Sequence, residues 1–155
     1  MHFSLVDRVL ETGPDRIVTL KQVTAAEEYL QDHFPGYPIL PGVFMLESMV
    51  QAARTLLDRP GGPRLVLGRV RNVKYGAMVR PGDALVVEIT VRKRGDDGAV
   101  ECNGTCRLRP AAVGTGTSPA EPADGGSAPD PATASASGET AASGRFTMRP
   151  VTASR

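Results

Sequence analysis

Two side chains in one short stretch of the sequence are candidates for acid–base chemistry. His33 is the only histidine away from the N-terminal end, and Glu47, fourteen residues later, is the only ionisable side chain in the apolar run 42–53. An imidazole accepts a proton near neutral pH. A carboxyl group that is taken out of water has a raised pKa and suits general acid work. The two residues are therefore a candidate acid–base pair.

Each residue alone also has a structural interpretation. A rotation of the helix could bring Glu47 to solvent or against an arginine, and a single histidine is more often a satisfied structural residue than a catalyst. The segment Asp32–Gly42 favours the catalytic interpretation. Its three prolines and two glycines fix an irregular backbone that leads directly into the helix carrying Glu47. His33 is thereby placed near the beginning of that helix.

The beginning of the same helix offers an electrophilic site. Pro41 stands at the helix start, so the N–H groups of Gly42 and Val43 are expected at the positive end of the helix dipole, without intrahelical acceptors. They could hydrogen-bond a carbonyl oxygen that becomes an enolate. Gln51, one turn after Glu47, could orient the carboxyl group by hydrogen bonding, and a plain polar contact in the core is the alternative.

These groups need a helix and a sheet to hold them. Apolar residues cover nearly the whole circumference of the predicted helix 42–57, so we expect it to be enclosed. A capping-box pattern at Thr24 and Glu27 predicts a short helix through about Leu30. Alternating and β-branched runs predict strands at 5–10, 16–22, 64–75, 84–94, 99–109 and 145–151. The expected class is α+β, a curved antiparallel sheet wrapped around one long central helix.

Length and composition limit the class of protein further. The 155 residues, 41% hydrophobic and 23% charged, allow one globular domain, and a net charge of +1 argues against a nucleic-acid binder. In the stretch 110–144, 30 of 35 residues are Gly, Ala, Pro, Ser or Thr, which predicts a disordered insertion with little to bury. The folded domain is then 1–109 plus 145–155, with 99–109 and 145–151 paired as a hairpin.

Several features are expected to be absent. Cys102 and Cys106 lie four residues apart in a predicted strand, too far for a disulfide, and no nearby histidine completes a zinc site. We therefore expect reduced structural thiols, no metal and no cofactor. No run approaches the roughly 18 apolar residues of a membrane span, and the N-terminal residues lack a leader pattern. A cytoplasmic protein that binds neither membrane nor nucleic acid is expected.

Three motifs together resemble a known family. They are His33-Phe-Pro-Gly, Pro38-Ile-Leu-Pro-Gly-Val43 and Leu46-Glu-Ser-Met-Val-Gln51. They are similar to segments of the FabA/FabZ-like 3-hydroxyacyl-[acyl carrier protein] dehydratases, which have the hot-dog fold. The likeness extends weakly to 6–11, 72–75 and 81–83.

The resemblance implies dehydration of a (3R)-3-hydroxyacyl thioester to the trans-2-enoyl thioester, in fatty-acid or polyketide-type biosynthesis. His33 would remove the C2 proton, Glu47 would protonate the departing C3 hydroxyl, and the Gly42 N–H would polarise the carbonyl. In this family the acid and the base meet across a dimer interface, which implies a homodimer or a heterodimer with a related hot-dog subunit. A Glu, where the isomerising branch usually has Asp, implies no double-bond shift.

The sequence departs from the family pattern at three places. Asp32 stands where Gly commonly precedes the histidine, and an acid beside the imidazole is expected to raise its pKa and weaken it as a base. Arg54 occupies a usually small position, and the insertion has no counterpart. Two other functions remain open. A hot-dog acyl thioesterase would not need His33 in this loop, and a non-catalytic subunit of a heterodimeric dehydratase would usually have lost the acid or the base.

The implied partner is an acyl carrier protein with a phosphopantetheine-linked acyl chain. Carrier proteins are acidic, and residues 54–110 hold twelve Lys and Arg against six acids, so this stretch is the expected docking surface. The first candidates are Arg69, Arg71, Lys74 and Arg80. A basic face that serves only solubility is the alternative.

Overall fold

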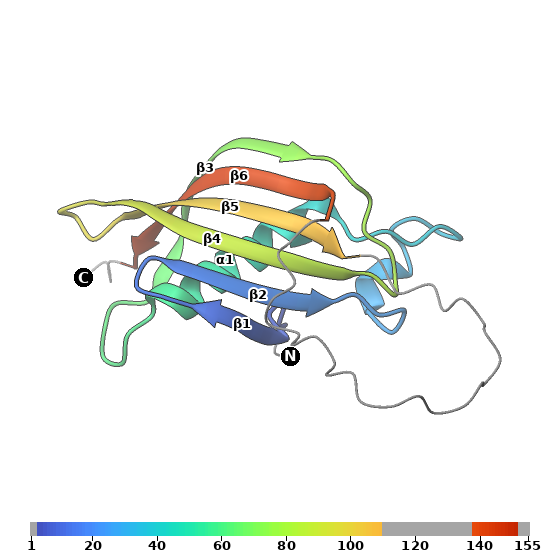
Figure 1. Ribbon diagram of the computed structural model, residues 1–155, viewed down its shortest axis with the longest axis horizontal. Coiled ribbons are helices and arrows are strands. Elements are labelled where there is room, and N and C mark those ends of the chain that lie inside the picture. The colour runs from blue at the N-terminus through green and yellow to red at the C-terminus, as the bar shows by residue number, and fades with distance from the viewer. Residues whose placement is uncertain (1–2, 110–137, 152–155) are drawn as a thin grey trace, which may run out of the picture.

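A long helix lies across one face of a six-stranded antiparallel sheet (Figure 1). The computed structural model describes residues 3–109 and 138–151. The elements are β1 (Arg8–Thr12), β2 (Arg16–Gln22), a 3₁₀ turn (Glu28–Leu30), α1 (Gly42–Leu57), β3 (Leu65–Tyr75), β4 (Ala84–Arg94), β5 (Val100–Arg109) and β6 (Thr140–Pro150). The strand order is β1-β2-β4-β5-β6-β3. The predicted α+β class, with a curved sheet around one long helix, is confirmed.

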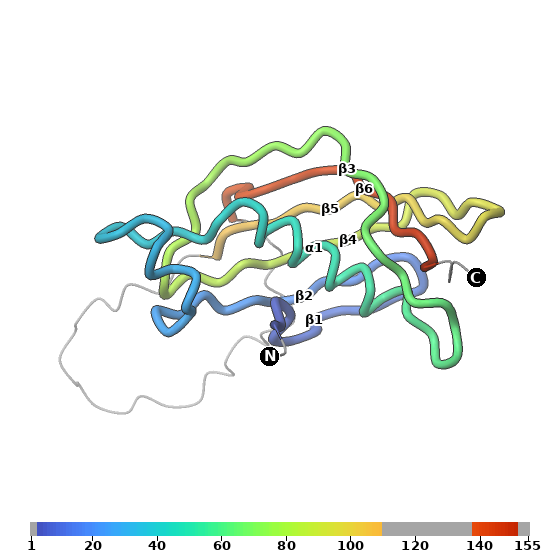
Figure 2. The backbone as a smooth tube through the Cα atoms, turned by 180° about the vertical axis from the view of Figure 1, so that it is seen from behind, coloured from blue at the N-terminus to red at the C-terminus, as the bar shows by residue number. Residues whose placement is uncertain are grey.

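Helix α1 rests directly on the sheet, as the view from behind shows (Figure 2). Its buried residues, Met45, Ser48, Met49, Val50, Ala52, Ala53 and Leu57, face the apolar inner side of the strands. Strand alternation puts Leu85, Val87 and Ile89 of β4 on that inner side. In β5, a side-chain carbon at Gly104 would lie 2.6 Å from Met49 Sδ. Because Gly104 has no side chain, α1 can approach β5 this closely.

The helix is enclosed on one side only, which corrects the expectation from its apolar circumference. Val43 is 65% exposed, and Phe44, Leu46 and Glu47 are half-buried. Part of this second side is covered by residues 3–7, where Leu5 is fully buried and the Phe3 ring lies 5.3 Å from the Phe44 ring. The rest of the apolar circumference remains uncovered in a single chain.

Two N-terminal elements differ from the prediction. The first strand begins at Arg8 and not at Leu5, because the Leu5 N–H donates to the side chain of Gln51 on the helix. The predicted helix from Thr24 to Leu30 is reduced to the 3₁₀ turn Glu28–Leu30, and no side chain caps it. The Glu27 carboxylate that a capping box requires is paired with Lys21 instead.

The last strand is longer than predicted. Strand β6 begins at Thr140 and not at Arg145, so residues 140–144 belong to the sheet and not to an insertion. Ala141 and Ala142 are fully buried, and Ala142 pairs with Tyr75 on one side and Cys106 on the other. The high content of small residues predicted disorder for this stretch, but these two alanines occupy buried positions of the sheet. The predicted pairing of the fifth and last strands is confirmed, and residues 110–137 of the predicted insertion lie outside the described residues.

Both cysteines lie on β5 as buried free thiols, as predicted. Burial raises the pKa of Cys102 to about 11, and burial raises the pKa of Cys106 still further, so both thiols stay protonated at neutral pH. Among the described residues no helix is long and apolar enough to cross a membrane.

Candidate active site

Backbone hydrogen bonds attach both ends of the loop that carries His33 to the connection between β3 and β4. At its start, Val23 N–H donates to Asp83 O at 3.0 Å, and Gly82 N–H donates to Val23 O at 2.9 Å. At its end, Leu40 N–H donates to Val79 O at 2.8 Å. The irregular segment before the helix is therefore fixed against the connection between β3 and β4.

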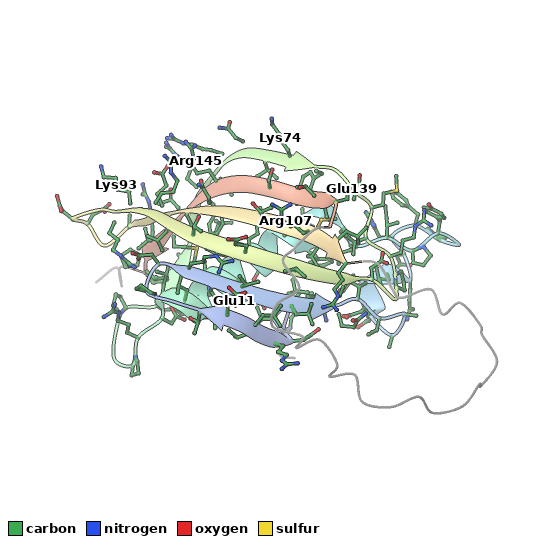
Figure 3. All side chains as sticks on the ribbon, viewed as in Figure 1. Glu11, Lys74, Lys93, Arg107, Glu139 and Arg145 are labelled. Atoms are coloured by element: carbon green, nitrogen blue, oxygen red, sulfur yellow. The ribbon has the colours of Figure 1, made fainter. Side chains whose placement is uncertain are left out.

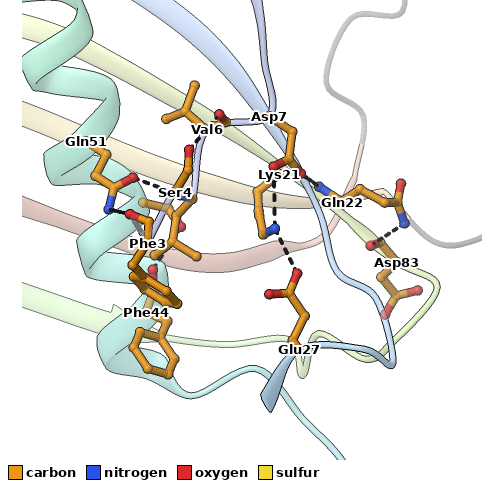
Figure 4. Close-up of polar contacts among 12 residues, drawn as sticks. Phe3, Ser4, Val6, Asp7, Lys21, Gln22, Glu27, Phe44, Gln51 and Asp83 are labelled. Carbon is orange, nitrogen blue, oxygen red and sulfur yellow. Dashed lines mark hydrogen bonds and ion pairs between the residues drawn. The ribbon is translucent and has the colours of Figure 1, made fainter. Parts of the chain in front are cut away.

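A buried lysine fixes the middle of the same loop. Lys21 lies on the inner side of β2, opposite the core residue Leu85, and is 6% exposed. Its Nζ lies 2.8 Å from Glu27 Oε1 and 3.4 Å from Asp7 Oδ1 (Figure 4). A charge taken out of water needs such partners, since an unpaired one costs several kcal/mol. The ion pairs thus join the loop to β2 and to the N-terminal segment.

The imidazole of His33 is held in one tautomer. Its Nδ1 lies 3.0 Å from the Ile39 carbonyl oxygen, which can only accept a hydrogen bond, so Nδ1 carries the proton. In the neutral ring this leaves the lone pair on Nε2. Asp32 makes no hydrogen bond or ion pair with the imidazole within the described part of the chain. The imidazole is thus oriented by the backbone of its own loop, in which Ile39 N–H also donates to His33 O.

Glu47 is held by the predicted hydrogen bond from Gln51. The Gln51 amide nitrogen Nε2 donates to Glu47 Oε1 at 3.0 Å, and the Gln51 Oε1 accepts from Leu5 N–H at 2.8 Å. The same Nε2 donates to Phe3 O at 3.3 Å (Figure 4). The N-terminal segment 3–7 therefore orients the amide that orients the carboxyl group. The sequence alone did not show this link, because nothing in the pattern relates residues 3–5 to a helix some forty residues later.

The helix start has the predicted free donors. Phe44 N–H and Met45 N–H both donate to Pro41 O, while the N–H groups of Gly42 and Val43 have no acceptor within residues 3–109 and 138–151. The ring of Tyr75, at the end of β3, lies over Gly42: a side-chain carbon there would come within 2.8 Å of Tyr75 Cε1. Gly42 is therefore the residue type that leaves room for Tyr75 beside the free N–H groups.

The structure does not join the acid and the base within one chain. No hydrogen bond or ion pair links His33 to Glu47 in the described ranges. Around them, five large apolar side chains are about half exposed or more, namely Phe34, Tyr37, Val43, Tyr75 and Met78. We call these five residues the apolar rim. An exposed apolar set of this size around polar groups is typical of a surface that another subunit covers.

The four predicted docking residues fall in two places. Arg80 lies beside the His33 loop, with its guanidinium carbon 4.5 Å from the centre of the Tyr37 ring, a cation–π contact. Arg69, Arg71 and Lys74 lie along β3, at the edge of the sheet.

A long helix lying on a curved antiparallel sheet of this order defines a hot-dog protein. A chain of the dehydratase heterocomplex ApeI:P from Xenorhabdus doucetiae superposes with a TM-score of 0.63 at 16% identity, covering 96% of this chain and 99% of that one. Zebra fish thioesterase superfamily member 2 superposes with a TM-score of 0.57 at 16% identity, covering 93% of this chain and 80% of that one. Since dehydratase and thioesterase structures match about equally well, these likenesses show the fold alone.

The family comes from the sequence comparisons. The family described as ApeI-like, ApeI dehydratase, matches residues 10–107. The 3-hydroxyacyl-[acyl-carrier-protein] dehydratase FabZ of Lactococcus lactis is 42% identical over 117 residues, which cover 73% of this chain and 81% of that protein. FabZ of Oenococcus oeni is 44% identical over 97 residues, 60% of this chain and 70% of that protein. The chain therefore belongs to the FabZ-like 3-hydroxyacyl-[acyl carrier protein] dehydratase family, and its resemblance to that family is confirmed.

The Lys21 ion pairs predict a large effect on stability. Replacing Lys21 with Met should lower the free energy of unfolding by about 3 kcal/mol, because the half-buried Glu27 carboxylate is left without its cation. The double variant Lys21→Met/Glu27→Gln should lose less than the sum of the two single changes. Lys93→Met, on an exposed position of β4, is the control and should change little. Urea unfolding of the wild type, the single variants Lys21→Met and Glu27→Gln, the double variant and the control measures these losses, and additive losses would contradict the coupling.

Proposed function

We propose that this chain removes water from a (3R)-3-hydroxyacyl thioester carried on an acyl carrier protein and yields the trans-2-enoyl thioester. One observation supports this reaction above the others. The backbone carbonyl of Ile39 holds the His33 Nδ1 proton, so that Nε2 is a base, in a chain whose relatives are named 3-hydroxyacyl-[acyl-carrier-protein] dehydratases. A thioesterase has no step that requires such a base in this loop. A non-catalytic subunit would not need both His33 and Glu47.

The proposed reaction balances without a redox partner. Nε2 of His33 takes the proton from C2, and the negative charge that develops on the thioester oxygen is stabilised by the free N–H groups at the start of α1. Glu47 gives its proton to the C3 hydroxyl, the C3–O bond breaks, and water leaves as the C2–C3 double bond forms. The imidazolium and the carboxylate then exchange one proton with solvent, which restores both groups.

The proposed site is shared between two subunits. Among the described residues of one chain no hydrogen bond or ion pair joins His33 to Glu47, and the apolar rim is exposed. A second hot-dog subunit that covers the rim would bring its own helix acid to the histidine of the first. The active unit is then a dimer, with His33 of one subunit facing the acid of the other.

The reaction and the shared site are tested together. His33→Ala and Glu47→Gln should each lower turnover about 10²-fold or more with the fold intact, since each removes one positioned proton carrier. The readout is the absorbance of the conjugated enoyl thioester, with free thiol measured in parallel. If a single chain type forms the dimer, mixing the two inactive variants should restore activity, because half of the sites in a mixed dimer receive one intact acid and one intact base.

Three results would contradict this proposal. Near wild-type turnover by either folded variant would remove that residue from the mechanism. Release of free thiol in place of enoyl product would identify a thioesterase. Failure of the mixed variants to regain activity, after subunit exchange between copies has been demonstrated, would place the acid and the base within one chain.

Gln51 should act as a positioning residue. Gln51→Met keeps the length of the side chain but removes the donor to Glu47, so kcat should fall roughly tenfold while KM changes little. Thr55→Val is the matched control, because Thr55 lies one turn further on α1 and its hydroxyl bonds only the Gln51 carbonyl. A parallel rise in KM, or an equal loss in the control, would show that the helix and not the carboxyl orientation was disturbed.

The carrier protein is proposed to dock at Arg80, the one candidate beside the His33 loop. Arg109 lies at the same end of the sheet, since it pairs with Ala84 just after the turn that contains Arg80. An acidic carrier would meet these two cations as its acyl chain enters near the start of α1. A polyketide-type pathway and a cytoplasmic location stay predictions from the sequence.

Charge reversal tests the docking site. Arg109→Glu should raise the apparent KM for the carrier-bound substrate roughly threefold to tenfold at low salt, and the difference should fade at about 0.5 M salt, where charges are screened. A small neutral thioester should be turned over as before. Arg92→Glu, an exposed position on β4 away from that end, is the control. Equal effects on both substrates would show that the carrier protein does not dock at this end of the sheet.

A further inference from the structure

Arg54 is the only basic residue of α1, and it lies on the same side of the helix as Glu47. Residues seven positions apart are separated by about two turns and share one side of a helix. Val43 lies on this side too and is 65% exposed, whereas Glu47 and Arg54 are half-buried. We call Val43, Glu47 and Arg54 the outer stripe of α1. The outer stripe therefore begins beside the free N–H groups of the helix start and ends in a cation.

The guanidinium group of Arg54 is held at the side of the helix without an acid partner. Its Nε donates to the carbonyl oxygen of Leu65, the first residue of β3, at 3.1 Å. No ion pair within residues 3–109 and 138–151 includes Arg54. Asp58, the next acid along the chain, follows one turn later and is not paired with it. The hydrogen bond thus fixes a charged group that no carboxylate of the described chain compensates.

Cations of the sheet point away from the helix. Arg107 and Arg145 project from the face of the sheet that is turned away from α1 (Figure 3). Their buried neighbours in the strands, Cys106 and Phe146, lie on the inner side, where Cys106 Sγ is 3.7 Å from a carbonyl oxygen of the helix. Arg107 and Arg145 therefore cannot meet a substrate that lies along α1, whereas Arg54 can.

The proposed function gives the direction in which an acyl chain runs over the outer stripe. In that reaction the thioester oxygen binds at the N–H groups of Gly42 and Val43, which have no acceptor in the described chain. The C3 hydroxyl is at Glu47, about 6 Å further along the helix axis. The path from C1 to C3 thus follows α1 toward its C-terminal end, and the carbons beyond C3 continue toward Arg54.

Arg54 lies where a chain of medium length would end. Seven residues of helix rise about 10 Å, and an extended chain advances about 1.2 Å per atom. A chain of about twelve carbons, counted from the thioester carbon, therefore reaches Arg54. A longer apolar chain would displace water from the guanidinium group and offer no hydrogen bond in return, which is unfavourable for a charge.

We propose that Arg54 is a specificity-determining residue, which limits the substrate to acyl chains of up to about twelve carbons. The direction of the chain rests on the proposed function, while the limit rests on the position and the charge of Arg54. The substrates are then short-chain and medium-chain (3R)-3-hydroxyacyl thioesters with an apolar end.

The selectivity for chain length tests this role. The value of kcat/KM is measured for carrier-bound substrates of sixteen and of eight carbons, and the ratio of the two is compared between wild type, Arg54→Met and Arg54→Gln. Each buried methylene group strengthens binding roughly fourfold, so both variants should raise the ratio at least tenfold. Arg54→Gln retains an N–H donor for the Leu65 carbonyl, so it keeps the test decisive if Arg54→Met unfolds.

Arg64→Met is the matched control, because Arg64 is an exposed arginine directly before Leu65. Its ratio should equal that of the wild type. A role of Arg54 in stability alone would lower the turnover of both substrates together and leave the ratio unchanged. Urea unfolding of the same variants measures that contribution separately.

The outcomes distinguish the limit from the reaction. Equal turnover of both chain lengths by the wild type, or an unchanged ratio in the folded Arg54 variants, would overturn the limit and leave the proposed function intact. A sixteen-carbon substrate with a terminal carboxylate provides a further comparison. If the wild type prefers it to the apolar one and Arg54→Gln does not, Arg54 binds that carboxylate and the limit is overturned. Absence of enoyl product at every chain length would contradict the proposed function and the limit with it.

Discussion

The structure depends on the contact between one side of α1 and the inner face of the sheet. Because Gly104 has no side chain, Met49 packs against the backbone of β5, and the axis of the helix is fixed close to the strands. That contact decides where the free N–H groups of the helix start and the carboxyl group of Glu47 lie. It also leaves the opposite side of the helix, with Val43 and Glu47, facing outward. The candidate catalytic groups on α1 therefore lie on the side of the helix that does not pack against the sheet.

The N-terminal segment 3–7 connects the two halves of the candidate site. Asp7 connects it to Lys21 and so to the loop that carries His33. Phe3 and Leu5 connect it to Gln51, which donates to Glu47. Each connection has one buried end, Lys21 in the first and Leu5 in the second, while Asp7 and Phe3 are exposed. The buried ends are where hydrogen bonds and ion pairs hold a single geometry better than they do in water. A segment without regular structure therefore contacts both parts of the candidate site.

The sequence predicted the elements whose signals are local. Pro41 and the apolar run placed α1 at Gly42–Leu57, and strict alternation placed β4 at Ala84–Arg94, both with the observed bounds. The incorrect secondary-structure predictions concern segments whose structure depends on contacts with residues far away in the sequence. Glu27 forms an ion pair with Lys21 and not a capping box, and the Leu5 N–H donates to the Gln51 side chain and not to a neighbouring strand. Ala141 and Ala142 belong to β6, which pairs with β3 on one side and β5 on the other. His33, Glu47 and Gly42 stay predictions from a motif, whereas Tyr75 and Phe3 lie beside them through contacts that no short pattern contains.

The position of β6 between β5 and β3 has a consequence for how the protein is made. In the part of the chain that the structure describes, β3 pairs only with β6, so Leu65 meets its partner Pro150 only after residue 150 has been synthesised. Because synthesis starts at the N-terminal end, α1 and β3 are made before β6. Until β6 has been made, β3 lacks the strand with which it pairs. Such distant pairings form slowly and leave apolar surface open meanwhile. In a newly made chain α1 can therefore pack first on β2, β4 and β5, and the part of the core that β3 and β6 complete closes last.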